Sequence, residues 1–240
     1  MPSRFNQRQS PARWGQVSTV LAFDCAVSGQ GVAIVREGQA LARLFEEGRD
    51  QAARLLPAIV AALEQAGVAR TELDLIAVTT GPGSFTGVRV GLSAARGLAV
   101  GLGIPLAGVA TTEVLRAQAP ATDRLVVAAV DTRLGDWFCA VGDDPAPFAA
   151  TTEDIAARLG GQRSLIVGKD VVPLAQSLRA AGVDAIAQEG PPDPVVLARL
   201  ALAEGVEAWS VRNRAGGLPR PLYLRGVNIT LPDGARRTVE

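Results

Sequence analysis

Two aspartates that end strand-like runs are the first candidates for chemistry. Asp24 closes the apolar run 20–24, and Asp131 closes an apolar run in the second half of the chain. Carboxylates at strand ends can organise a metal ion and a water molecule, or each can cap its own turn. Capping is the favoured interpretation, because glycine, which lets backbone amides reach a phosphate, first appears only at Gly29 and Gly135.

A glycine-rich turn between a strand and a helix is the second candidate. The turn is Gly81-Pro82-Gly83-Ser84-Phe85-Thr86-Gly87, and residues 88–102 after it form a predicted helix of small and apolar residues. It lacks the lysine of a P-loop, and the G-x-G-x-x-G spacing fails after Gly83. Three interpretations stay open: the turn binds a phosphate, contacts a partner protein, or lets the helix pack on its own sheet.

Composition excludes several kinds of site. The chain has no histidine, so Ser-His-Asp and Cys-His catalysis and histidine metal sites are ruled out. Cys25 and Cys139 lie in apolar runs without a C-x-x-C motif and are expected to be buried thiols. Acidic and basic residues number 24 each, so no overall field attracts nucleic acid or a membrane.

The first residues lack the apolar core of a signal peptide, and no apolar run reaches the roughly 18 residues of a membrane helix. We therefore expect a soluble, cytoplasmic protein.

Hydrophobic periodicity predicts alternating strands and helices. Strands 20–24, 31–36 and 40–45 suggest a three-stranded meander. An amphipathic helix follows at 49–66, with Gly67 as its natural stop. One side of this helix carries Leu55, Leu56, Ile59, Val60 and Leu63. The other predicted elements are strands 73–79, 105–109 and 164–168 and helices 151–159, 171–181 and 194–206.

The order of strand, aspartate, turn and strand occurs twice, at 21–34 and at 128–141. An internal repeat of this size predicts two lobes of related topology, each a mixed β-sheet flanked by helices. The predicted organisation is a flexible tail over 1–17, an N-terminal lobe over 18–112, a second lobe with a C-terminal helix over 113–226, and a flexible tail over 227–240.

The segment GPGSFTGVRVGLSAARGLAVGLGIPLAGV closely resembles the bacterial TsaB family. The runs LAFDCAVSGQGVAIV, AAVDTRLGDWFCAV and PLYLRG are also similar to that family, so the resemblance spans roughly Val20 to Gly226. It implies the two-lobed actin-like/hexokinase/Hsp70 ATPase superfold, an α/β fold that agrees with the repeat. TsaB proteins are non-catalytic partners in making threonylcarbamoyl-adenosine on tRNA, beside the anticodon.

The resemblance implies protein partners. We expect the chain to bind and stabilise TsaD, to allow TsaE to join, and to meet tRNA only through the complex; a homodimer through the same face stays open. The expected interface comprises Leu56, Ile59, Ser84, Phe85, Thr86, Gly87, Arg89, Gly91 and Ala95. Arg89 and Arg96 lie two helical turns apart, and they either reach acidic residues of a partner or are simply solvated.

The resemblance also implies a degenerate active site. The catalytic paralogue binds its metal through a histidine pair that this chain lacks, so we expect no catalytic residue and no metal. Asp24 and Asp131 are vestigial cofactor-binding residues, and any ATP or ADP is expected at an interface between subunits. Gln51 lies where the family usually has a histidine. The alternative function is a small-molecule kinase or ATPase of the same superfold.

Overall fold

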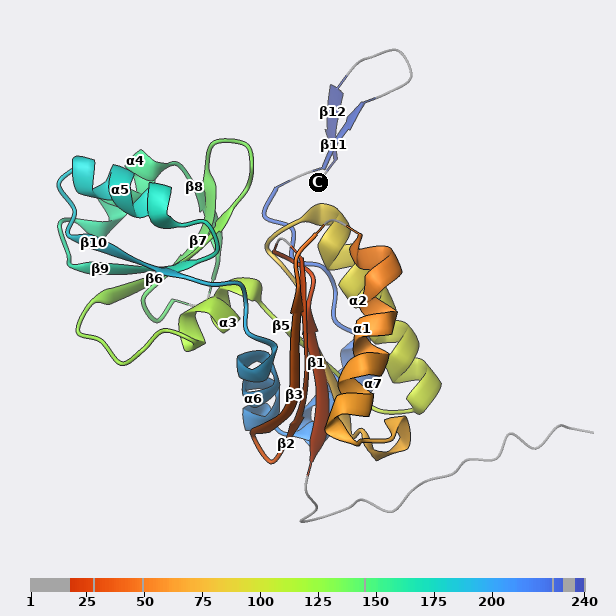
Figure 1. Cartoon of the computed structure of the whole chain (residues 1–240). Helices are drawn as coiled ribbons and strands as arrows, with labels where there is room; N and C mark the ends of the chain where they lie inside the picture. The colour runs from red at the N-terminus through yellow and green to blue at the C-terminus, as the bar shows by residue number, and fades with distance from the viewer. Residues whose placement is uncertain are drawn as a thin grey trace, which may run out of the picture.

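The computed structural model describes residues 18–27, 29–48, 50–144, 146–225, 227–230 and 236–239. These residues form two lobes, each built on its own five-stranded sheet (Figure 1). The predicted tail 1–17 lies outside the described residues. No described helix is long and apolar enough to span a bilayer.

The first sheet has the strand order β3-β2-β1-β4-β5. Its first three strands pair antiparallel, while β4 and β5 join parallel to β1. The predicted meander is therefore confirmed. The strand expected from residue 73 starts two residues later, after the 3₁₀ turn Arg70–Glu72. The strands are β1 (Thr19–Asp24), β2 (Gln30–Arg36), β3 (Gln39–Glu46), β4 (Leu75–Thr79) and β5 (Leu106–Val109).

The second sheet repeats this topology. Its order is β10-β9-β6-β7-β8, with β6, β7 and β8 antiparallel and β9 and β10 parallel to β6. The duplication confirms the predicted repeat and the actin-like superfold class. The strands are β6 (Leu125–Asp131), β7 (Trp137–Val141), β8 (Phe148–Ala150), β9 (Ser164–Gly168) and β10 (Ala185–Glu189).

Helices cover both faces of the first sheet, which explains why its central strands are apolar on both sides. The helices α1 (Gln51–Ala66) and α2 (Phe85–Leu102) pack over Leu21 and Phe23 of β1. The helices α6 (Pro194–Glu204) and α7 (Val206–Gly216) lie against the other face of that sheet, with Val20 and Ala22. The predicted second-lobe range 113–226 included this C-terminal helix, but the structure packs α6 against the first sheet.

The second sheet is covered by α4 (Thr152–Leu159) and α5 (Val172–Ala180) on one face and by α3 (Thr111–Ala117) on the other. The chain passes from the first lobe to the second through α3 and returns between β10 and α6 (Figure 1). In place of the tail expected after residue 226, β11 (Val227–Thr230) and β12 (Arg236–Val239) form a two-stranded antiparallel sheet.

The predicted apolar side of α1 is only partly correct. Leu55 and Ile59 are buried, together with the small residues Ala58 and Ala62, whereas Leu56 is 52% exposed and Val60 53% exposed. Ala58 and Ala62 fill the inner face, because α2 and the sheet approach closely there. Two large apolar side chains of α1 are thus left facing outward.

The glycines of α2 give matched substitutions that test how closely this helix packs. A Cβ on Gly87 would lie 1.9 Å from the Cys25 carbonyl oxygen, whereas a Cβ on Gly97 meets nothing within 4 Å. We predict that Gly87→Ala lowers the free energy of unfolding by about 1–3 kcal/mol. Gly97→Ala is expected to raise it by about 0.5–1 kcal/mol through helix propensity. Urea unfolding of both variants measures this, and equal effects would contradict the packing described.

Candidate functional site

The glycine turn packs on the backbone of its own lobe. A Cβ on Gly83 would lie 2.3 Å from the Ala26 carbonyl oxygen, and the Ser84 N–H donates to that same oxygen at 2.7 Å. Ser84 also caps α2, since its hydroxyl accepts from the Gly87 N–H at 3.2 Å. Of the three open interpretations, this geometry favours packing of the helix on the sheet: the glycines admit the β1–β2 turn.

The inner side of α2 corrects part of the expected partner interface. Gly87, Gly91 and Ala95 are buried against their own sheet, and a Cβ on Gly91 would lie 3.5 Å from Val78. Ile59 of α1 is buried as well, at 3% exposure. These four residues face the interior of their own lobe. Small residues recur along α2 on more than one side, so the sequence alone did not reveal which line faced inward.

The other expected interface residues do lie on the surface. Leu56 is exposed on α1, and Ser84, Phe85, Thr86 and Arg89 are exposed at the start of α2. These five are the part of the predicted interface that a partner could reach.

Arg89 and Arg96 both donate hydrogen bonds to residues between 219 and 223, although Arg89 stays exposed on the surface. The Arg89 Nε donates to the Tyr223 hydroxyl at 2.8 Å, and its guanidinium lies 3.5 Å from the centre of the Phe85 ring. Arg96 donates twice to the Pro219 carbonyl, at 3.2 and 2.5 Å. Residues 218–225, here called the C-terminal segment, are therefore built into the first lobe.

The C-terminal segment also reaches the second lobe. The Leu222 N–H donates to the Thr80 carbonyl at 2.8 Å, beside the glycine turn. Arg225 then pairs with Asp136 of the β6–β7 turn. The C-terminal segment therefore links the first lobe to the second.

Asp24 is buried at the end of β1, at 2% exposure. Its Oδ1 accepts from the Thr79 hydroxyl at 2.5 Å and from the Ala26 N–H at 3.1 Å. Burial raises the pKa of the Asp24 carboxyl from 3.8 to about 6, and hydrogen bonds from Thr79, Ala26 and Val27 only partly oppose this. No salt bridge among the described residues includes Asp24. The side chain caps its turn, as the sequence favoured, but it lacks a counter-ion.

Asp131 occupies the equivalent position in the second lobe, where a neighbouring cation compensates its negative charge. Its Oδ1 accepts from the Arg133 N–H at 2.7 Å, and its Oδ2 lies 3.5 Å from the Arg133 Nε. Arg133 has a positive φ of 61°, which turns its backbone toward the carboxylate. Asp131 is thus a turn cap with its own cation.

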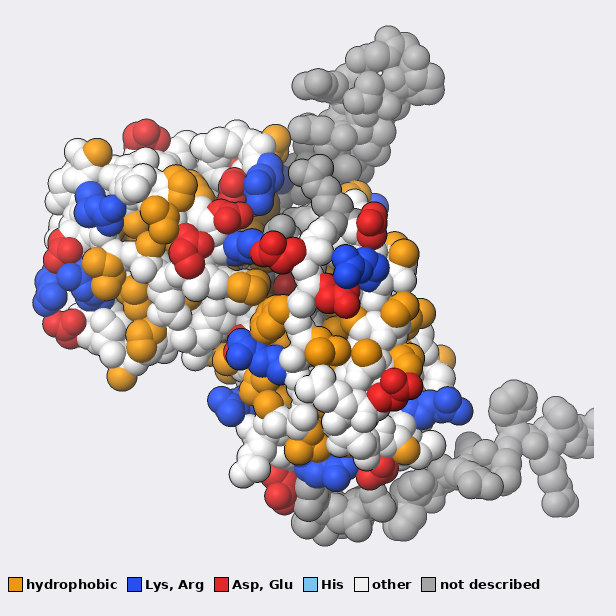
Figure 2. All heavy atoms as spheres, in the orientation of Figure 1, with side chains coloured by type: hydrophobic (Ala, Val, Ile, Leu, Met, Phe, Trp, Pro, Cys, Tyr) orange, Lys and Arg blue, Asp and Glu red, His pale blue; other side chains and the backbone are white. Residues whose placement is uncertain are grey.

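The two aspartates open onto separate cavities between the lobes. Asp24 lines one of about 630 Å³, and Asp131 lines one of about 580 Å³. Lys169 and Asp170, which follow β9, border both cavities. Lys169 reaches across to Glu47 of the first lobe at 2.8 Å. Figure 2 shows acidic and basic side chains next to one another where the lobes meet.

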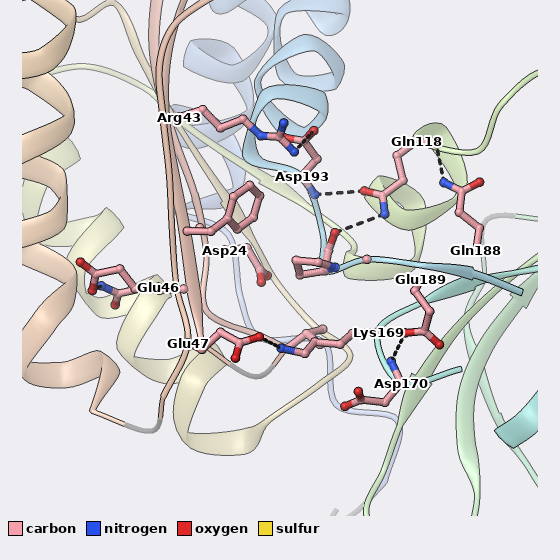
Figure 3. A pocket seen from close by; sticks show the side chains of 16 residues that line it. Asp24, Arg43, Glu46, Glu47, Gln118, Lys169, Asp170, Gln188, Glu189 and Asp193 are labelled. Carbon is pink, nitrogen blue, oxygen red and sulfur yellow. Dashed lines mark hydrogen bonds and ion pairs between the residues drawn. The ribbon is translucent and has the colours of Figure 1, made fainter. Parts of the chain in front are cut away.

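Gln118 joins the two chain crossings between the lobes. Its side-chain NH₂ donates to the Pro191 carbonyl at 3.2 Å, and its side-chain oxygen accepts from the Asp193 N–H at 3.0 Å. Its backbone carbonyl accepts from Gln188 at 3.2 Å (Figure 3). No motif in the sequence identified Gln118, because its partners lie more than sixty residues away.

The described residues hold no cluster of three or more His, Cys, Asp or Glu side chains suited to a metal ion. Both cysteines are buried, as expected. Burial raises the pKa of the Cys139 thiol to about 12, and it raises that of Cys25 further. Neither thiol is therefore a nucleophile at neutral pH.

The raised pKa of Asp24 predicts a pH-dependent effect of Asp24→Asn. The folded protein holds this proton more tightly than the unfolded chain, so ionisation lowers stability as pH rises through the window from 3.8 to about 6. Asn keeps the Oδ1 acceptor without the charge. We expect the stability of the variant relative to wild type to increase by about 2–3 kcal/mol from pH 4 to pH 8.

Urea unfolding at both pH values measures this difference, with Asp131→Asn as the control. If the stability of Asp24→Asn relative to wild type does not change with pH, burial does not raise the pKa of Asp24.

Comparisons with known proteins agree with the glycine-turn resemblance. A family model described as TsaD, tRNA N6-adenosine threonylcarbamoyltransferase, matches residues 46–159. The TsaB protein of Escherichia coli K12 is 35% identical over 123 residues, which is 50% of this chain and 53% of that protein. TsaB of Bacillus subtilis 168 is 35% identical over 121 residues, covering 50% and 53%. The chain thus spans about half the length of the curated relatives it matches.

Solved structures extend the match beyond the aligned sequence. YeaZ from Pseudomonas aeruginosa is 28% identical, with a TM-score of 0.66, over 86% of this chain and 100% of that one. A second structure from that organism, of a protein with similarity to peptidase YeaZ, gives a TM-score of 0.68 at 28% identity over 87% and 100%. The comparisons confirm the resemblance of this chain to the TsaB family.

Proposed function

We propose that this chain is a non-catalytic scaffold subunit in the biosynthesis of threonylcarbamoyl-adenosine on tRNA. It binds and stabilises a TsaD-type transferase and allows a TsaE-type ATPase to join, so that tRNA is reached through the complex. The similarity to TsaB proteins supports the pathway. The observation that carries the scaffold role is an apolar face on α1 and α2 that the described part of the chain leaves exposed.

That face combines large apolar residues with open helix backbone. Leu56 and Val60 are four residues apart, so they share one side of α1, and each is about half exposed. On α2, Val100 is 73% exposed, and a Cβ on Gly97 or Gly101 would meet nothing within 4 Å. The helices α1 and α2 pack side by side (Figure 1). Exposed apolar side chains beside bare helix backbone favour docking of another helix.

The hydrogen bonding of the two aspartates and the packing of the glycine turn fit a scaffold role better than a kinase role. The Asp131 carboxylate is bonded within its own turn, and Asp24 is held by Thr79 and Ala26. The backbone carbonyls of Cys25 and Ala26 occupy the space beside the glycine turn that a phosphate would need. We propose that any ATP or ADP sits at an interface between subunits, and that a homodimer would compete for the same α1–α2 face.

The proposal predicts that a charge on the α1–α2 face weakens partner binding without unfolding the protein. Val60→Arg should weaken co-purification with the TsaD-type subunit of the same cell by at least tenfold, or about 1.4 kcal/mol. Val211→Arg on α7 is the matched control, because Val211 is 51% exposed on a different helix. Both variants should melt near the wild-type temperature. Undiminished binding by a folded Val60→Arg protein would contradict the proposed face.

The kinase alternative predicts the opposite behaviour toward nucleotide. We expect the isolated chain to show no low-micromolar, magnesium-dependent ATP affinity in calorimetry, because the turns after Asp24 and Asp131 lack a phosphate clamp. Steady ATP turnover that disappears in Asp131→Ala would revive the kinase function.

A further inference from the structure

The cavity beside Asp24 has features of a binding site that neither the scaffold role nor the α1–α2 face uses. Its walls come from both lobes: Asp24 and Phe45 on one side, Lys169, Glu189 and Pro191 on the other. Figure 3 shows the Asp24 carboxylate directed into the space between these walls. The cavity holds about 630 Å³, enough for a small organic molecule.

The charges that line this cavity favour a cation. Six carboxylates border it, with only two cations, Arg43 and Lys169, among the lining residues. Low-dielectric walls lined mainly by one sign of charge concentrate ligands of the opposite sign. A phosphate would therefore be repelled, while a positively charged group would be attracted.

Most of these carboxylates already have partners. Glu47 pairs with Lys169 at 2.8 Å, and Asp193 pairs with Arg43 at 2.9 Å. Glu46 lies on the opposite side of the strands in Figure 3, where it pairs with Arg54 at 3.1 Å.

Two more acidic residues on the second-lobe wall also have interaction partners. Glu189 accepts the backbone N–H groups of Asp170 and Val172 at 2.7 and 2.8 Å. The Asp170 carboxylate lies 3.4 Å from Arg133.

Asp24 is the exception. It is buried, faces the cavity and has no cation beside it among the described side chains. Although Thr79 and Ala26 donate hydrogen bonds to it, a buried carboxylate without a neighbouring cation costs stability, so a ligand that supplies a positive charge gains from pairing with it. A metal ion would need several oxygen ligands and would have to break the existing pairs, whereas one ammonium group needs a single counter-ion.

An apolar surface lies next to this carboxylate. The Phe45 ring is 42% exposed, and Arg43 lies 4.8 Å from its centre. Pro191 lines the opposite wall. These two side chains offer apolar surface that a ring or short hydrocarbon chain of a ligand could cover.

We propose that this cavity binds a small organic amine in its ammonium form, paired with Asp24, with its hydrocarbon part against Phe45 and Pro191. Such a ligand touches both lobes, so its binding also holds the lobes at the spacing described.

A series of three probes with the same ring tests the charge preference on the full chain. Benzylammonium, benzyl alcohol and benzoate share a phenyl ring and carry charges of plus one, zero and minus one. Titration at pH 7.5, followed by protein NMR, should show benzylammonium binding at millimolar concentration, with benzyl alcohol at least tenfold weaker and benzoate weaker still. Equal binding of the alcohol, or no shift with benzylammonium, would overturn the proposal.

Variants locate the binding. Asp24→Asn and Phe45→Ala should each reduce benzylammonium affinity at least tenfold, while Asp131→Asn, in the other cavity, should leave it unchanged. If Asp24→Asn does not fold, Phe45→Ala and the probe series decide alone. Equal loss in Asp131→Asn would place the ligand elsewhere and overturn the assignment.

The pH dependence gives a further readout. Because burial raises the pKa of Asp24 to about 6, only about a tenth of it is ionised at pH 5, so affinity should fall about tenfold from pH 7.5 to pH 5. Other charged groups face this cavity, namely Arg43, Glu47, Lys169, Asp170, Glu189 and Asp193. Because these groups remain in Asp24→Asn, any pH dependence that they cause would persist in that variant, whereas the part caused by Asp24 should disappear. An undiminished pH dependence in Asp24→Asn would contradict the role of Asp24.

Discussion

The close contact between the glycine turn and the β1–β2 turn determines much of the first lobe. Gly83 and Gly87 have no side chain because the carbonyls of Ala26 and Cys25 occupy that space. This contact sets the depth at which α2 lies on the sheet and, with it, the sides of α2 that face inward and outward. It also fixes the backbone after Asp24, so the carboxylate faces the cleft while its turn stays closed to phosphate.

The strand pattern and the repeat were predictable because buried strands are continuous apolar runs, and two copies of one topology appear as two similar runs ending in aspartate. The orientation of α2 on the sheet, by contrast, was not predictable. A helix composed almost wholly of small and apolar residues has no polar face to mark the outside, so Gly91 and Gly97 are alike in sequence and opposite in environment. On α1, Ala58 and Ala62 take the inner face that large side chains usually occupy, and this leaves Val60 outside.

The candidate site was predictable at two positions, Asp24 and Asp131, since each follows a strand end. Their surroundings were not. The pair of Lys169 with Glu47 joins residues more than a hundred positions apart, and the link of Arg89 to Tyr223 spans even more of the chain. Pairings of this kind depend on how the lobes and the chain end come together, which hydrophobic periodicity does not report.

The coverage of the first sheet by α6, α7 and the C-terminal segment has a consequence for the order of events during synthesis. The second lobe is continuous in sequence and can fold as soon as it leaves the ribosome. The first lobe is made earlier yet stays incomplete, since one face of its sheet is bare and Arg96 lacks its partner Pro219 until residues 194–219 have been synthesised. The lobe that is translated first is therefore the last to be completed, and in the interval its uncovered strands are open to chaperones.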